Sequence, residues 1–405
     1  MIFNNYTRLA FRKILHNKGI NSINILGLAV GLMAVLLIFQ YIRYEKGYDK
    51  FLENSDRLKR LVFYRFYSTG LDRSVGNNYY IGQIAAEKIP EIENFCRVKK
   101  ETLFIRSGEQ VYKEERTLFA DSSFFDMFSY KVLSGDKPAF LRQPDRVILT
   151  ESAARKYFGD KNPVGRVIEA VNQGDKPLTV QGVIADVPGN THLKFDLLVS
   201  LSTITTPSYC YSCNNTNTYF LVRRGSDQAK IESQITNLGK ENFSEREIKI
   251  DFPIEFHLQS VTDIHLHSDY RFEFEPNGNG KYLTILFVIA VLILFSAGLN
   301  YLNLYTSVTG EKISRIGVRI INGASGRNVI LEFVTEALIT GLISLILSFV
   351  LLYLLFPLAK TLLSLSFNSD VLFNIRSWLI PVSFLVVLRI YITLTVAETD
   401  QIIQV

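Results

Sequence analysis

The chain has 405 residues, of which 48% are hydrophobic and 20% are charged, and its formal net charge is +5. A soluble protein of this length normally carries more charge, so part of the apolar surface must face something other than water. The net charge is modest, and the chain has neither a long basic run nor the spacings of RNA-binding or zinc-finger motifs, which argues against nucleic-acid binding. Three cysteines are too few for a disulfide scaffold. These numbers favour a membrane protein.

Residues 1–19 form a basic segment in which Arg8, Arg12 and His16 recur four residues apart. This spacing is typical of one face of a short amphipathic helix that lies on the inner surface of a membrane. A basic flank that only assists membrane insertion fits the same residues equally well. The apolar run that follows is longer than the core of a signal peptide and has no small-residue cleavage site after it, so we expect an uncleaved membrane helix.

Three apolar stretches are each long enough to cross a membrane as a helix. They are residues 20–42, 282–305 and 329–356. A fourth stretch, residues 377–397, is a weaker candidate, because it contains a proline and carries Arg389 near its middle, where a charge is costly in lipid. The sequence therefore predicts an α-helical membrane protein with four transmembrane helices.

The basic residues predict the orientation of these helices, because short cytoplasmic loops are enriched in lysine and arginine. Such residues are concentrated in the segments 1–19 and 306–328. We therefore expect both segments, and the tail at 398–405, to be cytoplasmic. Residues 43–281 and the short segment 357–376 then lie outside. The expected protein is a multi-pass membrane protein with its large domain on the external side.

The large external segment mixes strand-like and helix-like patterns. Residues Arg146–Thr150 and Leu178–Val187 are rich in branched side chains and bounded by turn formers, which predicts strands. Residues Glu151–Gly159 and Tyr79–Ile89 have the pattern of short helices, the first ended by glycine and the second by proline. Strands and helices do not alternate regularly, so we expect an α+β domain rather than a parallel α/β fold.

Two small clusters in this domain suggest a metal or redox site at first sight. Cys210 and Cys213 could form a local disulfide, or could hold zinc together with histidines. On a strand, His265 and His267 would share one face and could ligate a metal together. The two pairs are far apart in the sequence, and no third ligand has a clear spacing. We therefore expect a loop staple or ordinary thiols, packed or surface histidines, and no metal.

The stretch NGNGK, Asn277–Lys281, is similar to the end of a phosphate-binding loop. A complete loop of that kind needs an earlier glycine and a serine or threonine after the lysine, but Glu275 and Tyr282 occupy those positions. The stretch also precedes a predicted membrane helix on the external side. We therefore expect no nucleotide site in this chain, and no catalytic residues.

Four stretches of the chain resemble one known family. The external core domain of MacB-like ABC-transporter permeases is similar to Ser123–Ile168 (SFFDMFSYKVLSGDKPAFLRQPDRVILTESAARKYFGDKNPVGRVI), Gly182–Leu201 (GVIADVPGNTHLKFDLLVSL) and His265–Gly278 (HLHSDYRFEFEPNG). The FtsX-type permease segment is similar to Ala297–Ala337 (AGLNYLNLYTSVTGEKISRIGVRIINGASGRNVILEFVTEA). The resemblance extends to about Leu388. It implies a type VII ABC permease of the cell inner membrane, multi-pass and with its large domain in the periplasm, in which a separate ATPase drives motion of that domain.

The resemblance also implies a function for the basic segment 306–328, as the coupling element that docks on the ATPase subunit. Its glycines permit turns at the ends of a short helix parallel to the membrane, and its arginines can bond acidic residues of a partner. Ser325 is an expected N-cap of the next helix. The residues expected at this contact are Arg315, Gly317, Arg319, Gly323, Ala324, Ser325 and Arg327.

Two observations keep another interpretation of the coupling segment open. Residues 314–320 lack both the acidic residue and the lysine of the usual family pattern. The same arginines would also satisfy the charge bias of cytoplasmic loops without binding any partner.

The first apolar stretch contains Gly27 and Gly31, a small-xxx-small pattern that permits close approach of two helices. The second helix can belong to the same chain or to a second permease. The resemblance implies a dimer, which would be a homodimer or a heterodimer of permeases.

The expected function is that of a non-catalytic permease subunit in an export or mechanotransmission complex. The ATPase subunit binds the ATP, so this chain is expected to need no cofactor. The cargo classes we expect are drugs, peptides or lipoprotein-like molecules, and the expected partners besides the ATPase are the lipid membrane and a periplasmic adaptor, an outer-membrane channel or a hydrolase.

Two alternatives to an exporter remain. One is an FtsX-like regulator or scaffold that activates a periplasmic cell-wall hydrolase without moving cargo. The other is a half-size or truncated permease with reduced function, because the ending RIYITLTVAETDQIIQV departs from the usual last membrane helix of the family.

Overall fold

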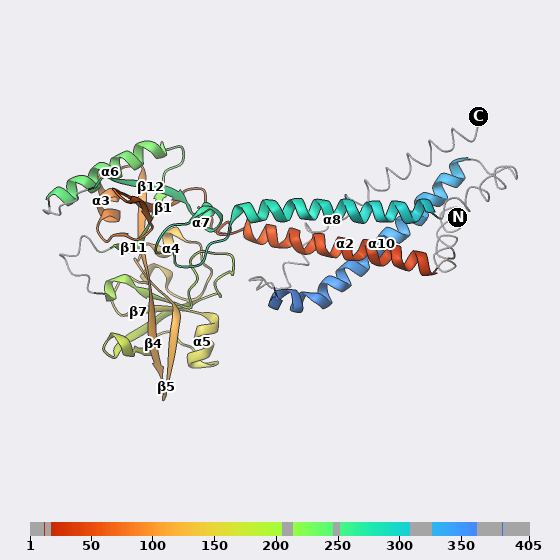
Figure 1. Cartoon of the computed structure of the whole chain (residues 1–405). Coiled ribbons are helices and arrows are strands. Elements are labelled where there is room, and N and C mark those ends of the chain that lie inside the picture. The colour runs from red at the N-terminus through yellow and green to blue at the C-terminus, as the bar shows by residue number, and fades with distance from the viewer. Residues whose placement is uncertain are drawn as a thin grey trace. The chain divides into compact units, whose positions relative to one another are not determined.

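The computed structural model describes residues 18–204, 214–245, 252–307 and 326–362, together with Arg12 and Ser383. The chain divides into two compact units. One unit is Glu45–Asn279, which we call the core domain, and the other is formed by the chain on either side of it. Figure 1 draws both units and labels many of their elements.

Among the described residues of the unit outside the core domain, three helices are long and apolar enough to cross a membrane. They are α2 (Lys18–Glu45), α8 (Gly280–Ser307) and α10 (Gly326–Leu362). Their most apolar parts have mean hydropathies of 2.5, 2.6 and 2.6. Apolar side chains such as Leu292 and Phe295 on α8 are exposed, as expected of a helix that faces lipid. Three of the four predicted membrane stretches therefore coincide with long apolar helices.

The helices differ from the predicted stretches mainly at their ends. α10 continues past Phe356 and through Pro357 to Leu362. A proline removes a backbone N–H from the helix, but its own carbonyl still serves as an acceptor, here for the hydroxyl of Thr361 at 3.0 Å. The fourth predicted stretch, residues 377–397, lies outside the described residues except for Ser383, and so does the segment 1–17 except for Arg12.

The core domain is built on a mixed sheet, which confirms the predicted α+β class. The strand order is β12-β1-β11-β4-β5-β10-β7-β9-β6, with β2 beside β1, β3 beside β11, and β8 beside β4 and β9. The strands are β1 (Leu58–Tyr67), β2 (Gly70–Ser74), β3 (Asn77–Asn78), β4 (Ile92–Ser107), β5 (Gln110–Ala120), β6 (Val132–Gly135), β7 (Arg146–Thr150), β8 (Val167–Ala170), β9 (Lys176–Ile184), β10 (Leu197–Ser200), β11 (Asn214–Val222) and β12 (Ile254–Ser260).

Most neighbouring strands are antiparallel, but β5 with β10 and β7 with β9 are parallel. The helices of this domain are α3 (Ile81–Lys88), α4 (Phe124–Met127), α5 (Glu151–Phe158), α6 (Gln228–Glu245) and α7 (Val261–His267), with short 3-10 turns at Lys137–Ala139, Val171–Gln173 and Leu201–Thr203. In Figure 1, α3 and α6 lie near β1 and β12, whereas α5 lies towards the other end of the domain.

Local sequence signals account well for the region from β7 to α5. The predicted strand Arg146–Thr150 is β7. Its last residue, Thr150, is also the N-cap of α5, and its side chain accepts a hydrogen bond from the backbone N–H of Ala153. The helix ends at Gly159, whose φ of 59° favours glycine. The predicted helix Tyr79–Ile89 and strand Leu178–Val187 are confirmed as α3 and β9, with ends shifted by one to three residues.

Three buried apolar clusters stabilise the core domain. The first surrounds Phe124 and Tyr219, near α4. The second packs α5 against β7 and β9. The third packs α3 and α6 against β1, β11 and β12, and includes Leu61 and Ile231. Each fully buried large apolar side chain contributes about 1.5–3 kcal/mol, so these clusters make the sheet and its helices a firm support for the polar groups between them.

Candidate functional site: the two attachments of the core domain

The predicted coupling residues from Arg315 to Ser325 lie outside the described residues. Of the predicted set only Arg327 falls in a described element, the first turn of α10, where the backbone alone is described. α10 begins at Gly326, the residue after Ser325. The coupling function of this segment therefore stays a prediction.

The two predicted packing glycines lie on α2, facing α8. A methyl group at Gly31 would lie 2.8 Å from the Cβ of Ala297, and one at Gly27 would lie 3.1 Å from the side-chain nitrogen of Asn300. Because Cβ atoms essentially never approach below 3.0 Å, only glycine fits at residue 31 in this arrangement. The rings of Phe39 and Phe287 meet edge to face on the same pair of helices, which run side by side in Figure 1. The glycines thus permit close packing within the chain.

The core domain begins and ends with two segments that are continuous in the chain with α2 and α8. We call Glu45–Leu52 the N-terminal attachment and Ser268–Asn279 the C-terminal attachment. Both belong to the core domain. Buried charged and polar side chains such as Asp49, Arg60 and His265 make the contacts that hold these two segments, and these contacts form the candidate site.

Asp49 is the central residue of the N-terminal attachment. Its side chain is fully buried, and its φ of 59° is one that aspartate tolerates better than most residues. The carboxylate accepts a hydrogen bond of 2.6 Å from the hydroxyl of Thr191 and lies 2.8 Å from Nδ1 of His192. The backbone N–H of Asp49 donates to the carbonyl of Asn190 at 3.0 Å. A buried carboxylate with several donors is strongly held, since leaving it unpaired would be costly.

The Asp49 network continues through His192 to the sheet. Nε2 of His192 lies 3.0 Å from the hydroxyl of Tyr219 on β11. A carboxylate only accepts hydrogen bonds, so Nδ1 carries the ring proton that faces Asp49. Burial raises the pKa of Tyr219, so its hydroxyl keeps its proton.

The order Asp49–His192–Tyr219 is similar to a catalytic triad in its hydrogen bonds alone. A nucleophile needs access to substrate and a lowered or assisted pKa. Tyr219 is fully buried, and its pKa is raised. The arrangement therefore acts as a clamp that ties the N-terminal attachment to the central strands.

A second contact joins the two attachments to each other. Nε2 of His265 on α7 lies 2.7 Å from a carboxylate oxygen of Glu45, and the ring of Tyr48 stacks on the His265 ring with centroids 3.4 Å apart. Gly278 lies against this pair, because a methyl group there would be 2.9 Å from both Glu45 Oε2 and His265 Nε2. The N-terminal and the C-terminal attachments therefore both contact the buried side chain of His265.

The C-terminal attachment is held by Arg60 on β1, which is only 1% exposed. The guanidinium donates to both carboxylate oxygens of Glu273, at 2.6 and 2.7 Å. It also donates to Gln259 at 2.6 Å and to the hydroxyl of Ser268 at 3.1 Å. A planar guanidinium matches two carboxylate oxygens in a fixed geometry, so this pair gives both attraction and register.

Lys100 on β4 holds the C-terminal attachment at the two residues that follow Glu273. Its ammonium donates to the carbonyl of Phe274 at 2.6 Å and to the carboxylate of Glu275 at 2.8 Å. The side chain of Asn277 donates to the carbonyl of Ser268 at 3.1 Å, which closes the segment on itself. Asn277 and Glu275 thus serve as structural anchors, and Gly280 and Lys281 are the first residues of α8.

The structure describes the two histidines that the sequence pairs, but not the two cysteines. His265 and His267 lie on the helix α7, so the placement on a strand is wrong. His265 is buried in the contact just described, whereas His267 is exposed. Cys210 and Cys213 lie outside the described residues. Within the ranges that the structure describes, no group of three His, Cys, Asp or Glu side chains could hold a metal ion.

Sequence reasoning missed the residues that form the attachments. Asp49, Arg60 and His192 have no motif spacing, because their partners are distant in the chain. Asp49 and His192 are 143 positions apart, and Arg60 and Glu273 are 213 apart. The available signal was indirect, since His192 and Glu273 lie inside stretches that carry the family resemblance.

Two family models and several named proteins match the sequence of this chain. Residues 22–238, more than half of the chain, match the family model of the MacB-like periplasmic core domain, and residues 287–399 match that of the FtsX-like permease C-terminal region. The macrolide export ATP-binding/permease protein MacB of Salmonella choleraesuis (strain SC-B67) is 25% identical over 272 residues. That match covers 65% of this chain and 39% of the Salmonella protein, so the chain spans well under half the length of this relative.

Two solved structures are also similar. A domain of a putative permease from Porphyromonas gingivalis is 19% identical with a TM-score of 0.43, over 52% of this chain and 91% of that one. The periplasmic region of MacB from Actinobacillus actinomycetemcomitans is 16% identical with a TM-score of 0.36, over 53% of this chain and 96% of that one.

The family models cover most of the core domain and the region that follows it, and in the described part of the chain three helices able to cross a membrane precede or follow a domain of the periplasmic type in the sequence. The chain belongs to the MacB/FtsX-like family of type VII ABC-transporter permeases.

Proposed function

We propose that this chain is the permease subunit of an ABC-type export or mechanotransmission complex. A separate ATPase subunit binds and hydrolyses ATP, and the permease converts the resulting motion of its membrane helices into movement of its periplasmic core domain. The permease itself carries out no catalysis. The MacB relatives are named as ATP-binding and permease proteins in one chain, whereas the region 306–328 of this chain is proposed to contact the ATPase as a separate partner.

One observation carries this proposal. The two attachments of the core domain meet at Glu45, His265 and Gly278, and each is bound to the sheet by a buried charged group. Asp49 holds the first attachment and Arg60 the second. Protein interiors are close-packed and yield little to compression, so a displacement of either segment moves the sheet with it. Such a connection is what a mechanical coupling between membrane helices and an external domain needs.

The proposed topology has four membrane helices. The segments 1–19 and 306–328 and the tail 398–405 lie in the cytoplasm, and the core domain and the segment 357–376 lie in the periplasm. The distribution of basic residues supports this arrangement. The complex contains two permeases, identical or different, and its cargo is a drug, a peptide or a lipoprotein-like molecule handed to a periplasmic adaptor or an outer-membrane channel.

The test of the coupling proposal is a double charge reversal, Arg315→Glu with Arg319→Glu, in the full chain co-expressed with candidate ABC ATPase subunits. We expect co-purification of the ATPase, and ATP turnover in the complex, to fall about tenfold or more, because the arginines would then repel acidic partner groups. Unchanged association and turnover would contradict the proposal.

The matched control reverses two cations of the core domain, Lys113→Glu with Arg155→Glu. Both side chains are exposed. This control should leave association and turnover unchanged. Protease accessibility of the core domain in intact vesicles shows whether either double variant has altered the orientation of the chain in the membrane, which separates a lost contact from a lost topology.

A further inference from the structure

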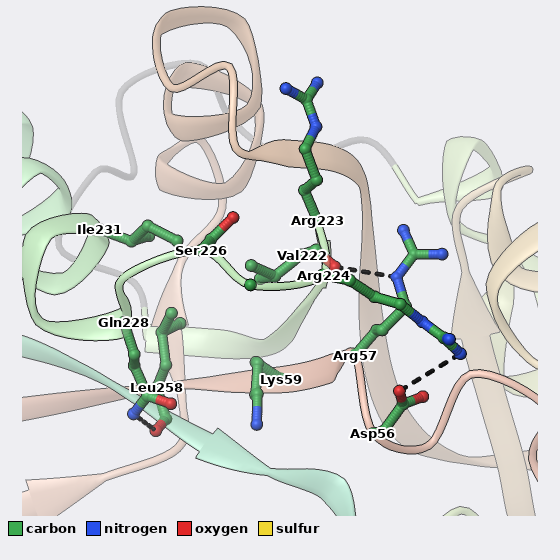
Figure 2. Close-up of a pocket in the computed structure, with 11 residues that line it drawn as sticks. Asp56, Arg57, Lys59, Val222, Arg223, Arg224, Ser226, Gln228, Ile231 and Leu258 are labelled. Carbon is green, nitrogen blue, oxygen red and sulfur yellow. Dashed lines mark hydrogen bonds and ion pairs between the residues drawn. The ribbon is translucent and has the colours of Figure 1, made fainter.

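A cavity of about 420 Å³ lies in the core domain where β11 ends and α6 begins. Its wall includes residues from β1, β11, β12 and α6, and four of them are cations. Figure 2 shows these side chains with the ion pair and hydrogen bonds among them. The cations are Arg57, Lys59, Arg223 and Arg224. A volume of this size is within the range of small-molecule sites, which is about 300–1,000 Å³.

Few carboxylates offset these cations. Asp56 is the acidic residue of the cavity wall, and it pairs with Arg224 at 3.4 Å. Glu93 lies outside the wall and pairs with both Arg57 and Arg223, the latter at 3.8 Å. Two carboxylates therefore pair with these four cations, a third, Glu91, acts on Arg223 at longer range, and the pairs of Arg223 and Arg224 are long and largely exposed. Such exposed pairs are weak, so these arginines remain available to another anion.

Lys59 is the cation with most capacity for a ligand. Successive residues of a strand point to opposite faces, so Lys59 faces the α6 side with Leu61, while Arg60 faces the other side. The side chain is half-buried, and within the described ranges of the chain no carboxylate lies within 4.0 Å of its ammonium. The view in Figure 2 draws it between the pair Gln228–Leu258 and the pair Arg224–Asp56.

Much of the remaining wall is apolar or already hydrogen-bonded. Val222 and Leu258 are buried members of the third apolar cluster and form part of the wall. The side chain of Gln228 donates to the carbonyl of Leu258 at 2.8 Å, and Arg57 donates to the carbonyl of Val222 at 3.0 Å. These bonds satisfy two backbone acceptors that would otherwise repel an anion. An apolar wall with a few convergent donors is the usual composition of a small-molecule site.

We propose that this cavity binds a small organic anion. A carboxylate or phosphate group of the ligand lies at Lys59, with Arg224 and Arg57 nearby, and an apolar body of the ligand packs against Val222 and Leu258. The cavity lies wholly within the core domain, and the inference stands independently of the ATPase and of the coupling segment.

The test uses the full chain in lipid nanodiscs and the probe 4-(trifluoromethyl)benzoate, whose fluorine line width in NMR reports binding. We expect the line to broaden with the protein and to sharpen when ionic strength is raised, because exposed charges are screened. The neutral 4-(trifluoromethyl)benzamide, with nearly the same shape, should bind at least about tenfold more weakly. The probe 4-(trifluoromethyl)phenyl phosphate forms a second arm, and the tighter of the two anions identifies the head group. Nanodiscs without protein correct for partition into lipid.

The decisive variants are Lys59→Gln and Arg224→Gln. We expect Lys59→Gln to weaken binding of the better anion about tenfold and Arg224→Gln about threefold. Arg155→Gln is the matched control for the second variant, since Arg155 is 71% exposed and paired to Glu151, while Arg224 is 74% exposed and paired to Asp56. Arg224→Gln changes only a surface side chain, so it decides the matter even where Lys59→Gln fails to fold. Equal binding of the benzamide, or equal binding by the Arg224→Gln and Arg155→Gln proteins, overturns the proposal.

Discussion

Lys59 and Arg60 are neighbours on β1, yet they have opposite environments. Arg60 is buried on one face of the sheet and donates to Glu273, Gln259 and Ser268. Lys59 is half-buried on the other face, in the wall of a cavity with more cations than carboxylates. The two residues are adjacent in the sequence, so their position does not explain the difference. Arg60 is a structural anchor because its charge is paired, and Lys59 is a potential ligand group because its charge is not paired with a carboxylate among the described residues. Buried charges must be paired, whereas partly solvated charges can remain available.

The largest expected effect comes from removing the buried partner. Arg60→Ala leaves Glu273 without its paired cation, and loss of one member of a buried ion pair costs about 3–5 kcal/mol. We therefore expect the free energy of unfolding of the core domain, measured by urea titration of the full chain with circular dichroism, to fall by about that amount. Lys59→Ala is the neighbouring control and should cost under about 1 kcal/mol. If Arg60→Ala and Lys59→Ala lowered the free energy of unfolding by similar amounts, the proposed difference between the two faces of β1 would be wrong.

A smaller effect is expected at the N-terminal attachment. Tyr219→Phe keeps the ring but deletes the hydroxyl that lies 3.0 Å from Nε2 of His192. The ring nitrogen then has no partner in a buried place, which costs about 1–3 kcal/mol. The control is Tyr64→Phe, which deletes a half-buried hydroxyl 3.1 Å from that of Tyr270 and should cost about 1 kcal/mol or less. A Tyr219→Phe protein as stable as wild type in the same urea titration would refute the clamp.

The smallest effect is a pH dependence at a half-exposed pair. The hydrogen bond with Glu232 raises the pKa of His257, burial opposes the rise, and a second hydrogen bond with Glu255 adds to it. The pKa of His257 is higher in the folded protein than in the unfolded chain, where it is near 6.5. The pair therefore stabilises the fold fully at pH values below the pKa of the unfolded chain, and this stabilisation is lost as pH rises through the pKa of the folded protein. Because the ring is partly exposed, we expect the pair to contribute under about 1 kcal/mol to the free energy of unfolding.

The variant for this pH test is His257→Gln, which cannot titrate. The midpoint of urea unfolding of the wild-type protein should fall more steeply than that of His257→Gln as pH rises above about 6.5. The groups facing His257 are Glu232 on α6, Glu255 on β12 itself, and the ring of Tyr64 on β1. Parallel curves for the two proteins would show that the pair contributes nothing measurable.

Local signals explain why part of the structure could be predicted. The three apolar stretches coincide with α2, α8 and α10, because a run of about 20 apolar residues has one low-energy form in lipid, a helix that satisfies its own backbone. β7 and α5 were predicted from branched residues and a terminal glycine, and the structure adds the N-cap at Thr150. The ends were less predictable, as the passage of α10 through Pro357 shows.

The candidate site could not be predicted in the same way. On a strand, His265 and His267 would share one face. They lie on the helix α7 instead, where residues two positions apart point in different directions, so that His265 is buried against Tyr48 and His267 is exposed. The cavity at Lys59 is lined from β1, β11, β12 and α6. No periodicity within one of these segments indicates that they meet.

The sequence by itself determined the membrane character, the three helices able to cross a membrane, the α+β class and the family. These depend on composition, on periodicity and on stretches of local sequence. The tertiary structure alone decided that Asp49 meets His192, that Arg60 meets Glu273, and that Lys59 lies in a cavity. Long-range pairs of charged groups form only where the folded sheet brings them together and removes water from between them, and the strength of each pair depends on that burial.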